Sequence, residues 1–295
     1  MHGFSYILDI LLSGITVGSL YALIAIGYTM VYGILRLINF AHGDIFMMAG
    51  FFMVYVSATT GPLLAIPIVL ILTVLLGVLI EKAAYKPLRT APRMSVMISA
   101  IGVSYLLQNL ATYVTGGLAQ AYPNIPWLRK EIALGSITVK RLAILTPLLT
   151  ILLVVALVLI IKHTKMGMAM RAVAKDFDTA QLMGIRIDRV ISITFVIGSL
   201  LAAVGSILYF SYIGQVSPTI GSMPGLKSFV AAVFGGIGSV PGAVIGSYII
   251  GICETFIKSN QDISIFSNAF TFALLIVILL IKPNGLFGEK LKEKV

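Results

Sequence analysis

The chain has 295 residues, of which 59% are hydrophobic and only 11% are Asp, Glu, Lys or Arg. Soluble domains carry roughly 25% charged residues, so this composition excludes a water-soluble globule and predicts an integral membrane protein. The net charge is +10, but the basic residues are spread over short segments between long apolar runs, which excludes the concentrated basic face of a nucleic-acid-binding protein. The single cysteine, Cys253, and three scattered histidines exclude an internal disulfide and supply no metal-ligand spacing.

Uncharged runs, taken in chain order, predict about eight transmembrane helices, because a spanning helix needs about 20 apolar residues. Residues 10–35 form the first run, which is too long for the apolar core of a signal peptide and is interpreted as a retained span. Residues 45–80 are long enough for two spans, divided at the turn sequence Thr59-Thr60-Gly61-Pro62. Residues 94–114, 142–161, 190–213 and 263–281 each predict one more span.

A polar segment, residues 36–44, separates the first two runs. Asn39 and His42 can donate and accept hydrogen bonds, and Gly43 permits close approach of the backbone. A simple cytoplasmic turn is the alternative, and spacing alone favours neither interpretation. We predict that the segment breaks the chain at the end of the first span, faces the protein interior and contributes to a translocation path through Asn39, Phe40, Ala41, His42 and Gly43.

The run at residues 228–253 is also uncharged, but a glycine-rich stretch interrupts it. Close helix packing explains Gly242 and Gly246, which form a GxxxG face. A re-entrant pair of half-helices explains the other residues, since Gly235, Gly236, Gly238 and Pro241 together break a helix. We predict that residues 235–242 are non-helical near the bilayer midplane and line the path. The dipole ends of broken helices suit a zwitterionic solute such as an amino acid.

Basic segments orient the predicted helices, since cytoplasmic loops are rich in Lys and Arg. Residues 82–93, residues 162–189 and the tail 282–295 are therefore predicted to be cytoplasmic. Residues 116–141 then lie outside, although this loop also holds four basic residues. The re-entrant pair keeps the tail cytoplasmic, because a single crossing there would place it outside. The whole chain, residues 1–295, is predicted to form one transmembrane domain.

The cytoplasmic segment 162–189 contains a predicted helix on which Phe177, Ala180 and Gly184 fall on one face. Small residues there, together with Ala174, favour docking into a groove of another protein. The alternative is a helix lying on the bilayer, which the basic residues would also suit.

The sequence lacks two features that would indicate how transport is powered: a nucleotide-binding motif and an acidic residue in the middle of a span. The chain has no GxxxxGK[ST] sequence, so it does not itself bind ATP through a P-loop. The acidic residues of the spans lie at or near span ends, whereas a proton-coupled carrier generally needs a buried titratable group. These residues are Asp9, Asp44, Glu81 and Glu254.

Three sequences carry a resemblance to a known family: residues 27–43, GYTMVYGILRLINFAHG, residues 235–242, GGIGSVPG, and residues 282–288, KPNGLFG. Through them the chain resembles the branched-chain amino acid ABC permeases, specifically the H-type subunits of leucine/isoleucine/valine (Liv) systems, over nearly its whole length. The resemblance implies an all-α, polytopic permease of the ABC importer type in the bacterial inner membrane. It also implies a transport subunit without enzyme activity, which carries leucine, isoleucine and valine.

The resemblance further implies partners: a homologous second permease, two cytoplasmic ATP-binding subunits and a periplasmic substrate-binding protein. Membrane lipid would surround the helices of this chain. ATP would be used by the partners, and this chain would bind no cofactor. Ala174, Asp176, Ala180 and Gly184 match a degenerate form of the family's coupling motif, which here lacks a Glu-Ala-Ala triplet. The alternatives are an importer for urea, amides or other amino acids, a secondary transporter, and a passive channel, which would need no coupling segment.

Overall fold

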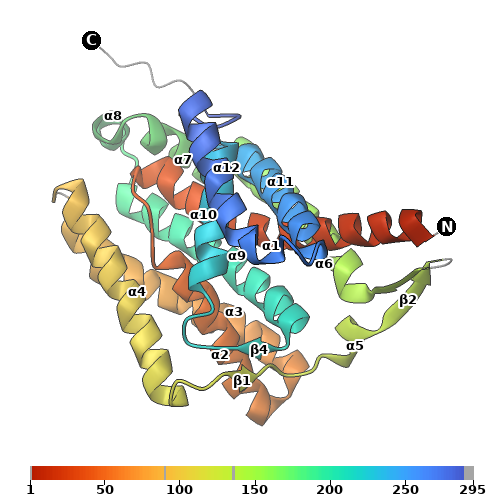
Figure 1. Cartoon of the computed structure of the whole chain (residues 1–295). Coiled ribbons are helices and arrows are strands. Elements are labelled where there is room, and N and C mark those ends of the chain that lie inside the picture. The colour runs from red at the N-terminus through yellow and green to blue at the C-terminus, as the bar shows by residue number, and fades with distance from the viewer. Residues whose placement is uncertain (1, 90, 135–136, 289–295) are drawn as a thin grey trace.

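The computed structural model describes residues 2–89, 91–134 and 137–288 and is almost entirely helical (Figure 1). Its long helices are α1 (His2–Leu35), α2 (His42–Thr60), α3 (Pro62–Ile80), α4 (Arg93–Thr115), α6 (Arg141–His163), α9 (Ile187–Ile213), α11 (Val240–Ser259) and α12 (Ser267–Ile281). Within this described part of the chain, eight helical segments are long and apolar enough to cross a membrane. The prediction of about eight transmembrane helices is confirmed.

Shorter elements connect these helices. They are the π-helical turn η1 (Glu81–Tyr85), the 3-10 turns η2 (Lys86–Leu88) and η3 (Ser264–Phe266), and the helices α5 (Pro126–Arg129), α7 (Lys165–Lys175), α8 (Phe177–Leu182) and α10 (Ser222–Gly235). Strand β1 (Gln120–Ala121) pairs antiparallel with β4 (Gln215–Val216), and β2 (Glu131–Leu134) pairs antiparallel with β3 (Ile137–Lys140). The β1–β4 pair fastens the loop between α4 and α6 to the segment that follows α9.

The boundary between α2 and α3 falls at the predicted turn. Gly61 adopts φ +81°, which is strained for a residue with a side chain. Pro62 occupies the first position of α3, where the missing N–H would have had no partner within the helix.

The basic segments gather at one end of the bundle. The Arg36 guanidinium, just past α1, donates to the Ala174 carbonyl of α7 at 3.4 Å, and the tail donates from Phe287 N–H to the Gly235 carbonyl at 2.9 Å. We call this end, which carries residues 82–89, 91–92, 164–186 and 282–288, the basic end. Residues 116–134, 137–140 and 214–216 lie at the opposite end (Figure 1). That the basic end is cytoplasmic stays a prediction, and residues 289–295 of the tail lie outside the described part.

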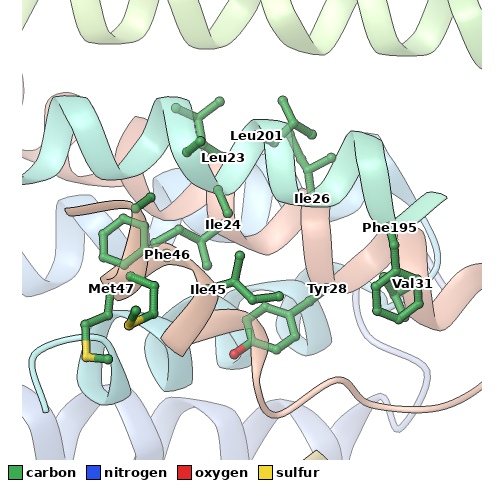
Figure 2. Close-up of a cluster of buried hydrophobic side chains, with 14 of the residues drawn as sticks. Leu23, Ile24, Ile26, Tyr28, Val31, Ile45, Phe46, Met47, Phe195 and Leu201 are labelled. Atoms are coloured by element: carbon green, nitrogen blue, oxygen red, sulfur yellow. The ribbon is translucent and has the colours of Figure 1, made fainter. Parts of the chain in front are cut away.

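The core lies where α1, α2 and α9 cross (Figure 2). Of the 18-residue apolar stretch that qualifies each helix as a span, 67% is buried in α1 and in α9, against 11% in α12. A helix that is apolar all round suits such a central position, and Leu23, Ile24 and Ile26 of α1 belong to the same buried cluster as Phe46 of α2 and Phe195 of α9. α1 and α9 therefore form the fixed centre around which the other helices are placed.

The predicted pair of half-helices is wrong in its second member and in its depth. α10 has 14 residues, about 21 Å, and is too short to span, but α11 has 20 residues and is a candidate span. Only residues 236–239 are non-helical, because Gly235 ends α10 while Pro241 and Gly242 lie in the first turn of α11. A Cβ added at Gly33, near the end of α1, would lie 3.6 Å from Gly238 Cα, so the break lies at the basic end.

The tail explains the position of this break. The last carbonyls of α10, from Phe234 and Gly235, accept from Leu286 N–H and Phe287 N–H, both at 2.9 Å. Carbonyls at a helix end have no partner within the helix and need one from elsewhere. The tail supplies it, which allows the chain to turn at the basic end instead of the midplane.

Candidate functional site

The start of α2 lies inside the bundle. A Cβ added at Gly27 would overlap the imidazole of His42, the first residue of α2. Gly27 precedes Leu35, the last residue of α1, by 8 positions, about 12 Å along the helix. Residues 36–41 therefore turn back into the bundle before α2 begins.

The start of α10 lies beside the start of α2. A Cβ on Gly43 would lie 2.8 Å from the Gly221 carbonyl oxygen, and one on Gly221 would overlap the Gly43 oxygen. A Cβ on Gly225 would lie 2.9 Å from the Gly43 Cα. Only glycines allow two backbones to approach so closely, so the N-terminal ends of two helices meet inside the protein.

A cavity of about 300 Å³ opens where these two helix starts face α4. We call it the polar cavity, because its lining includes the polar side chains of Tyr28, Asp44, Ser104, Gln108 and Ser222. Apolar and aromatic side chains complete the lining, namely Phe40, Ile101, Tyr105, Leu226 and Phe229, together with three glycines of the helix starts.

A second cavity, of about 210 Å³, follows the same α2–α4 seam toward the opposite end. Its lining is almost wholly apolar and consists of Met48, Phe51, Phe52, Tyr55, Leu110, Ala111, Val114 and Thr115. The polar cavity thus lies nearer the basic end of a largely apolar seam between α2 and α4.

The structure places only part of the predicted segment 39–43 in the polar cavity. Phe40 and Gly43 line it, while Ala41 is fully buried. Asn39 and His42 are each 2% exposed, so the segment faces the protein interior, as predicted.

Asn39 and His42 support the cavity wall from behind. The Tyr85 hydroxyl of η1 donates to Asn39 Oδ1 at 2.7 Å. The His42 ring packs edge-on against Tyr28, with ring centroids 4.9 Å apart. Tyr28, which Figure 2 shows among the core residues, therefore connects the core of α1 with the cavity wall.

The glycine-rich segment does not join the polar cavity. Gly235 and Gly242 contact each other where α10 and α11 cross, and Gly236 packs against the tail. Gly238 and Pro241 are exposed. The structure does not bring these residues together with segment 39–43, and their contribution to a path stays a prediction.

Sequence reasoning missed Asp44 and Gln108. It placed Asp44 at the end of a span, but the return of residues 36–41 into the bundle leaves Asp44 only 2% exposed. The Gln108 side-chain amide donates to Asp44 Oδ1 at 3.0 Å. A signal was present, because Ser104 and Gln108 are four residues apart in an apolar run and so lie on one face of α4.

Sequence reasoning also missed the burial of Glu254, which lies five positions before the end of α11, at Ser259. It lies in α11 and is 1% exposed. Lys227 Nζ of α10 donates to Glu254 Oε1 at 2.6 Å, and Lys258 Nζ lies 2.5 Å from the same oxygen. The Tyr21 hydroxyl of α1 donates to Oε2 at 2.9 Å. A buried carboxylate needs such partners, and these tie α10 to α1 and α11.

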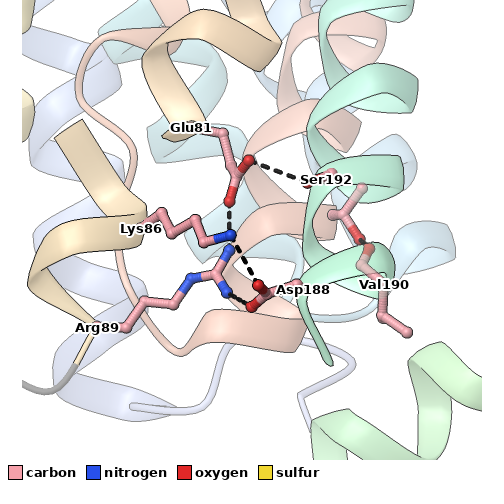
Figure 3. Close-up of polar contacts among 7 residues, drawn as sticks. Glu81, Lys86, Arg89, Asp188, Val190 and Ser192 are labelled. Atoms are coloured by element: carbon pink, nitrogen blue, oxygen red, sulfur yellow. Dashed lines mark hydrogen bonds and ion pairs between the residues drawn. The ribbon is translucent and has the colours of Figure 1, made fainter. Parts of the chain in front are cut away.

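A further buried carboxylate, Glu81, lies at the basic end (Figure 3). The Arg89 guanidinium bridges Glu81 and Asp188, and Lys86 Nζ lies 2.8 Å from Asp188. The Ser192 hydroxyl donates to Glu81 at 3.0 Å. This cluster fastens the turns after α3 to the start of α9, which directly follows the predicted coupling segment.

The coupling segment is two helices instead of one, so the predicted face shared by Phe177, Ala180 and Gly184 is wrong. Asp176 separates α7 from α8, and its carboxylate accepts from Thr179 N–H at 3.1 Å, which caps α8. Gly184 lies beyond α8 with φ +81°. Because a capping aspartate favours a helix start over a helix interior, the segment breaks there.

Ala174 and Ala180 also differ from expectation. Ala180 is 4% exposed, so its side chain packs within this chain and offers little surface for docking. Ala174 is partly buried in the last turn of α7. Large apolar side chains are instead exposed at Leu182 and Met183, at 87% and 79%.

Comparison with known proteins agrees with the all-helical membrane fold. Residues 10–279 match the family model described as the permease component of a branched-chain amino acid transport system. The chain belongs to this permease family. It is 41% identical to the "High-affinity branched-chain amino acid transport system permease protein LivH" of Escherichia coli (strain K12), over 99% of both chains.

Two further relatives are similar over almost their full length. The permease is 40% identical to the LivH protein of Salmonella typhimurium over 99% of both chains. It is 38% identical to the BraD protein of Pseudomonas aeruginosa, named as a permease of the same kind of system, over 97% of both chains. With eight apolar helices in the part of the chain that the structure describes, the protein is a multi-pass protein of the bacterial inner membrane and a permease component of its transport system.

Proposed function

We propose that this permease is a membrane subunit of an ATP-driven importer and that its solutes are the branched-chain amino acids. The observation that carries the proposal is the identity of 40% or more, over 99% of both chains, to relatives named for that transport. The polar cavity gives independent support, since both polar and apolar side chains line it. A solute with a charged end and a branched apolar side chain fits such a lining.

In this proposal ATP is hydrolysed by two separate cytoplasmic subunits. The contact surface would be the end of α8 and the residues after it, where Leu182 and Met183 expose large apolar side chains at the basic end. An ATP-binding subunit covering them would remove this apolar surface from water. Movement of α8 would then reach α9 directly, because only residues 183–186 separate them.

The remaining partners are a homologous second permease and a periplasmic substrate-binding protein. The position of α4 supports the proposal of a second permease. α4 lines the polar cavity, yet only 22% of its 18-residue apolar stretch is buried within this chain. A second membrane subunit on α4 would close the cavity into a path between the two permeases.

The solute assignment is tested with the assembled transporter in proteoliposomes, with binding protein outside and ATP inside. Uptake of radiolabelled leucine should be competed by isoleucine and valine and not by urea or acetamide. Competition by urea with no effect of valine would contradict the proposed solute while leaving the importer class in place.

Asp44 supports a second candidate, a proton-coupled secondary transporter, because it is a buried carboxylate inside a membrane protein. The two candidates differ in their energy source. An imposed pH gradient without ATP would drive uptake in a secondary transporter and would not in an importer. Uptake driven by trapped ATP in the presence of a protonophore would reject the secondary transporter.

A further inference from the structure

Asp44 is a buried carboxylate whose hydrogen-bond partners are neutral. It is the third residue of α2 and 2% exposed. The Gln108 amide donates to it at 3.0 Å, and Ser104 also hydrogen-bonds to it. Among the residues that the structure describes, no Lys, Arg or His side chain forms an ion pair with Asp44, although the other buried carboxylates, Glu81 and Glu254, each have a cation.

An unpaired charge within a membrane is costly, and such groups generally face a water-filled cavity or a partner. Asp44 lines the polar cavity. Its position in the first turn of α2 lowers the cost partly, because the positive end of the helix dipole lies there. The remaining stabilisation can come from a cation that enters the cavity.

The rest of the cavity fits the other parts of an amino acid. Ser222, at the first position of α10, also lines the cavity, and the Gln108 amide lies 3.3 Å from its hydroxyl. A carboxylate group is favoured at such a helix start. Phe40 and Phe229 also line the cavity, with ring centroids 6.3 Å apart, and can receive an aliphatic side chain.

We propose that the polar cavity is a transient binding subsite for an amino acid, in which Asp44 holds the α-ammonium group. The carboxylate of the solute would lie toward Ser222 and the start of α10, and its side chain against Phe40 and Phe229. The subsite rests on the proposed function, since it assumes that amino acids pass through this subunit. It adds a solute contact within the permease itself.

The test uses a cysteine reporter in the assembled transporter. The only native cysteine is removed by Cys253→Ala, and Ile101→Cys places a thiol in the cavity lining. Labelling rates are measured with a cationic and an anionic methanethiosulfonate, with and without leucine. With Asp44 present, the cationic reagent should react faster and millimolar leucine should slow labelling.

Asp44→Asn should reduce the cation-to-anion rate ratio severalfold and raise the leucine concentration for half-protection at least tenfold. Asp44→Glu, which retains the charge, should keep both effects, and it covers the case in which Asp44→Asn fails to assemble. Asp188→Asn, which removes an exposed carboxylate at the basic end, is the matched control and should change neither value. Unchanged protection in Asp44→Asn, or no protection by leucine in any variant, would overturn the subsite.

ATP-driven leucine uptake by the same preparation separates the two proposals. Uptake without protection at Ile101→Cys rejects the subsite and leaves the proposed function intact. Absence of ATP-driven uptake in the Cys253→Ala parent rejects the proposed function itself.

Discussion

Lys227 Nζ of the short helix α10 lies 2.6 Å from Glu254 Oε1 of the spanning helix α11, and both side chains are almost fully buried. α10 is too short to hold its place by spanning the membrane, so this ion pair fixes it laterally while the tail caps its end. The position of Gly221 and Ser222, and thus one wall of the polar cavity, depends on that attachment.

The ion pair predicts unequal effects of its two members on stability. Glu254→Gln leaves Lys227 buried without a counter-charge, and removal of one partner of a buried pair costs about 3–5 kcal/mol. Lys227→Met should cost less, because Lys258 still lies 2.5 Å from Glu254. Thermal unfolding of the purified permease in detergent measures the difference.

The double variant Lys227→Met/Glu254→Gln supplies the control for this prediction. It removes both charges and should be more stable than Glu254→Gln alone. If Lys227→Met were the most damaging of the three, the structural role of Lys258 would be wrong.

The cluster at the start of α9 predicts that Arg89 matters more than Asp188 (Figure 3). Arg89→Ala leaves the buried Glu81 without its cation, and removal of one partner of a buried ion pair costs about 3–5 kcal/mol. Asp188→Asn should have little effect, since its side chain is 60% exposed and exposed ion pairs contribute little. Thermal unfolding of both variants compares them directly, and equal losses would contradict a special role for Glu81.

The contact between Gly27 and His42 predicts that the start of α2 tolerates no added methyl group on α1. Gly27→Ala places a Cβ into the buried imidazole, and overpacking of this kind typically costs about 1–3 kcal/mol. Gly102→Ala is the matched control, because a Cβ there meets nothing within 4 Å. Unfolding temperatures should fall for Gly27→Ala and stay equal or rise for Gly102→Ala.

The exposed residues after α8 predict where an ATP-binding subunit docks. Leu182→Ser should reduce co-purification of that subunit several-fold without changing the unfolding temperature of the isolated permease, because the side chain is 87% exposed. Gln181→Ser, at the neighbouring exposed position, is the control. Equal co-purification of both variants would place the contact elsewhere. Ala180→Trp is a poor probe, since Ala180 is buried and its replacement would disturb the permease itself.

Local sequence signals predicted the helices but not the depth at which they begin. Uncharged runs located the spans, and Gly61 with Pro62 located the turn between α2 and α3, because these features depend on nearby residues. The buried start of α2 depends on a contact between Gly27 and His42, and the capped end of α10 depends on Leu286 and Phe287. Such pairings are distant in sequence, so no local pattern reveals them.

The same distinction explains the candidate site. Segment 39–43 is predictable because polar residues interrupt an apolar run, whereas the local sequence indicates for Asp44 only a position at the end of a span. Its role in the cavity follows only from the return of the chain into the bundle and from Gln108 on α4. The spacing of Gly184 predicts a shared helix face only if the segment is one helix, and the capping by Asp176 divides it in two.

Leucine accumulation in proteoliposomes tests whether this chain is needed for ATP-driven import of branched-chain amino acids. The ATP-binding subunits, the second permease and the binding protein are reconstituted with or without this chain, with ATP trapped inside and a protonophore present. We expect ATP-dependent accumulation of leucine only when this chain is included. Accumulation that persists without this chain, or that needs a proton gradient instead of ATP, would contradict it.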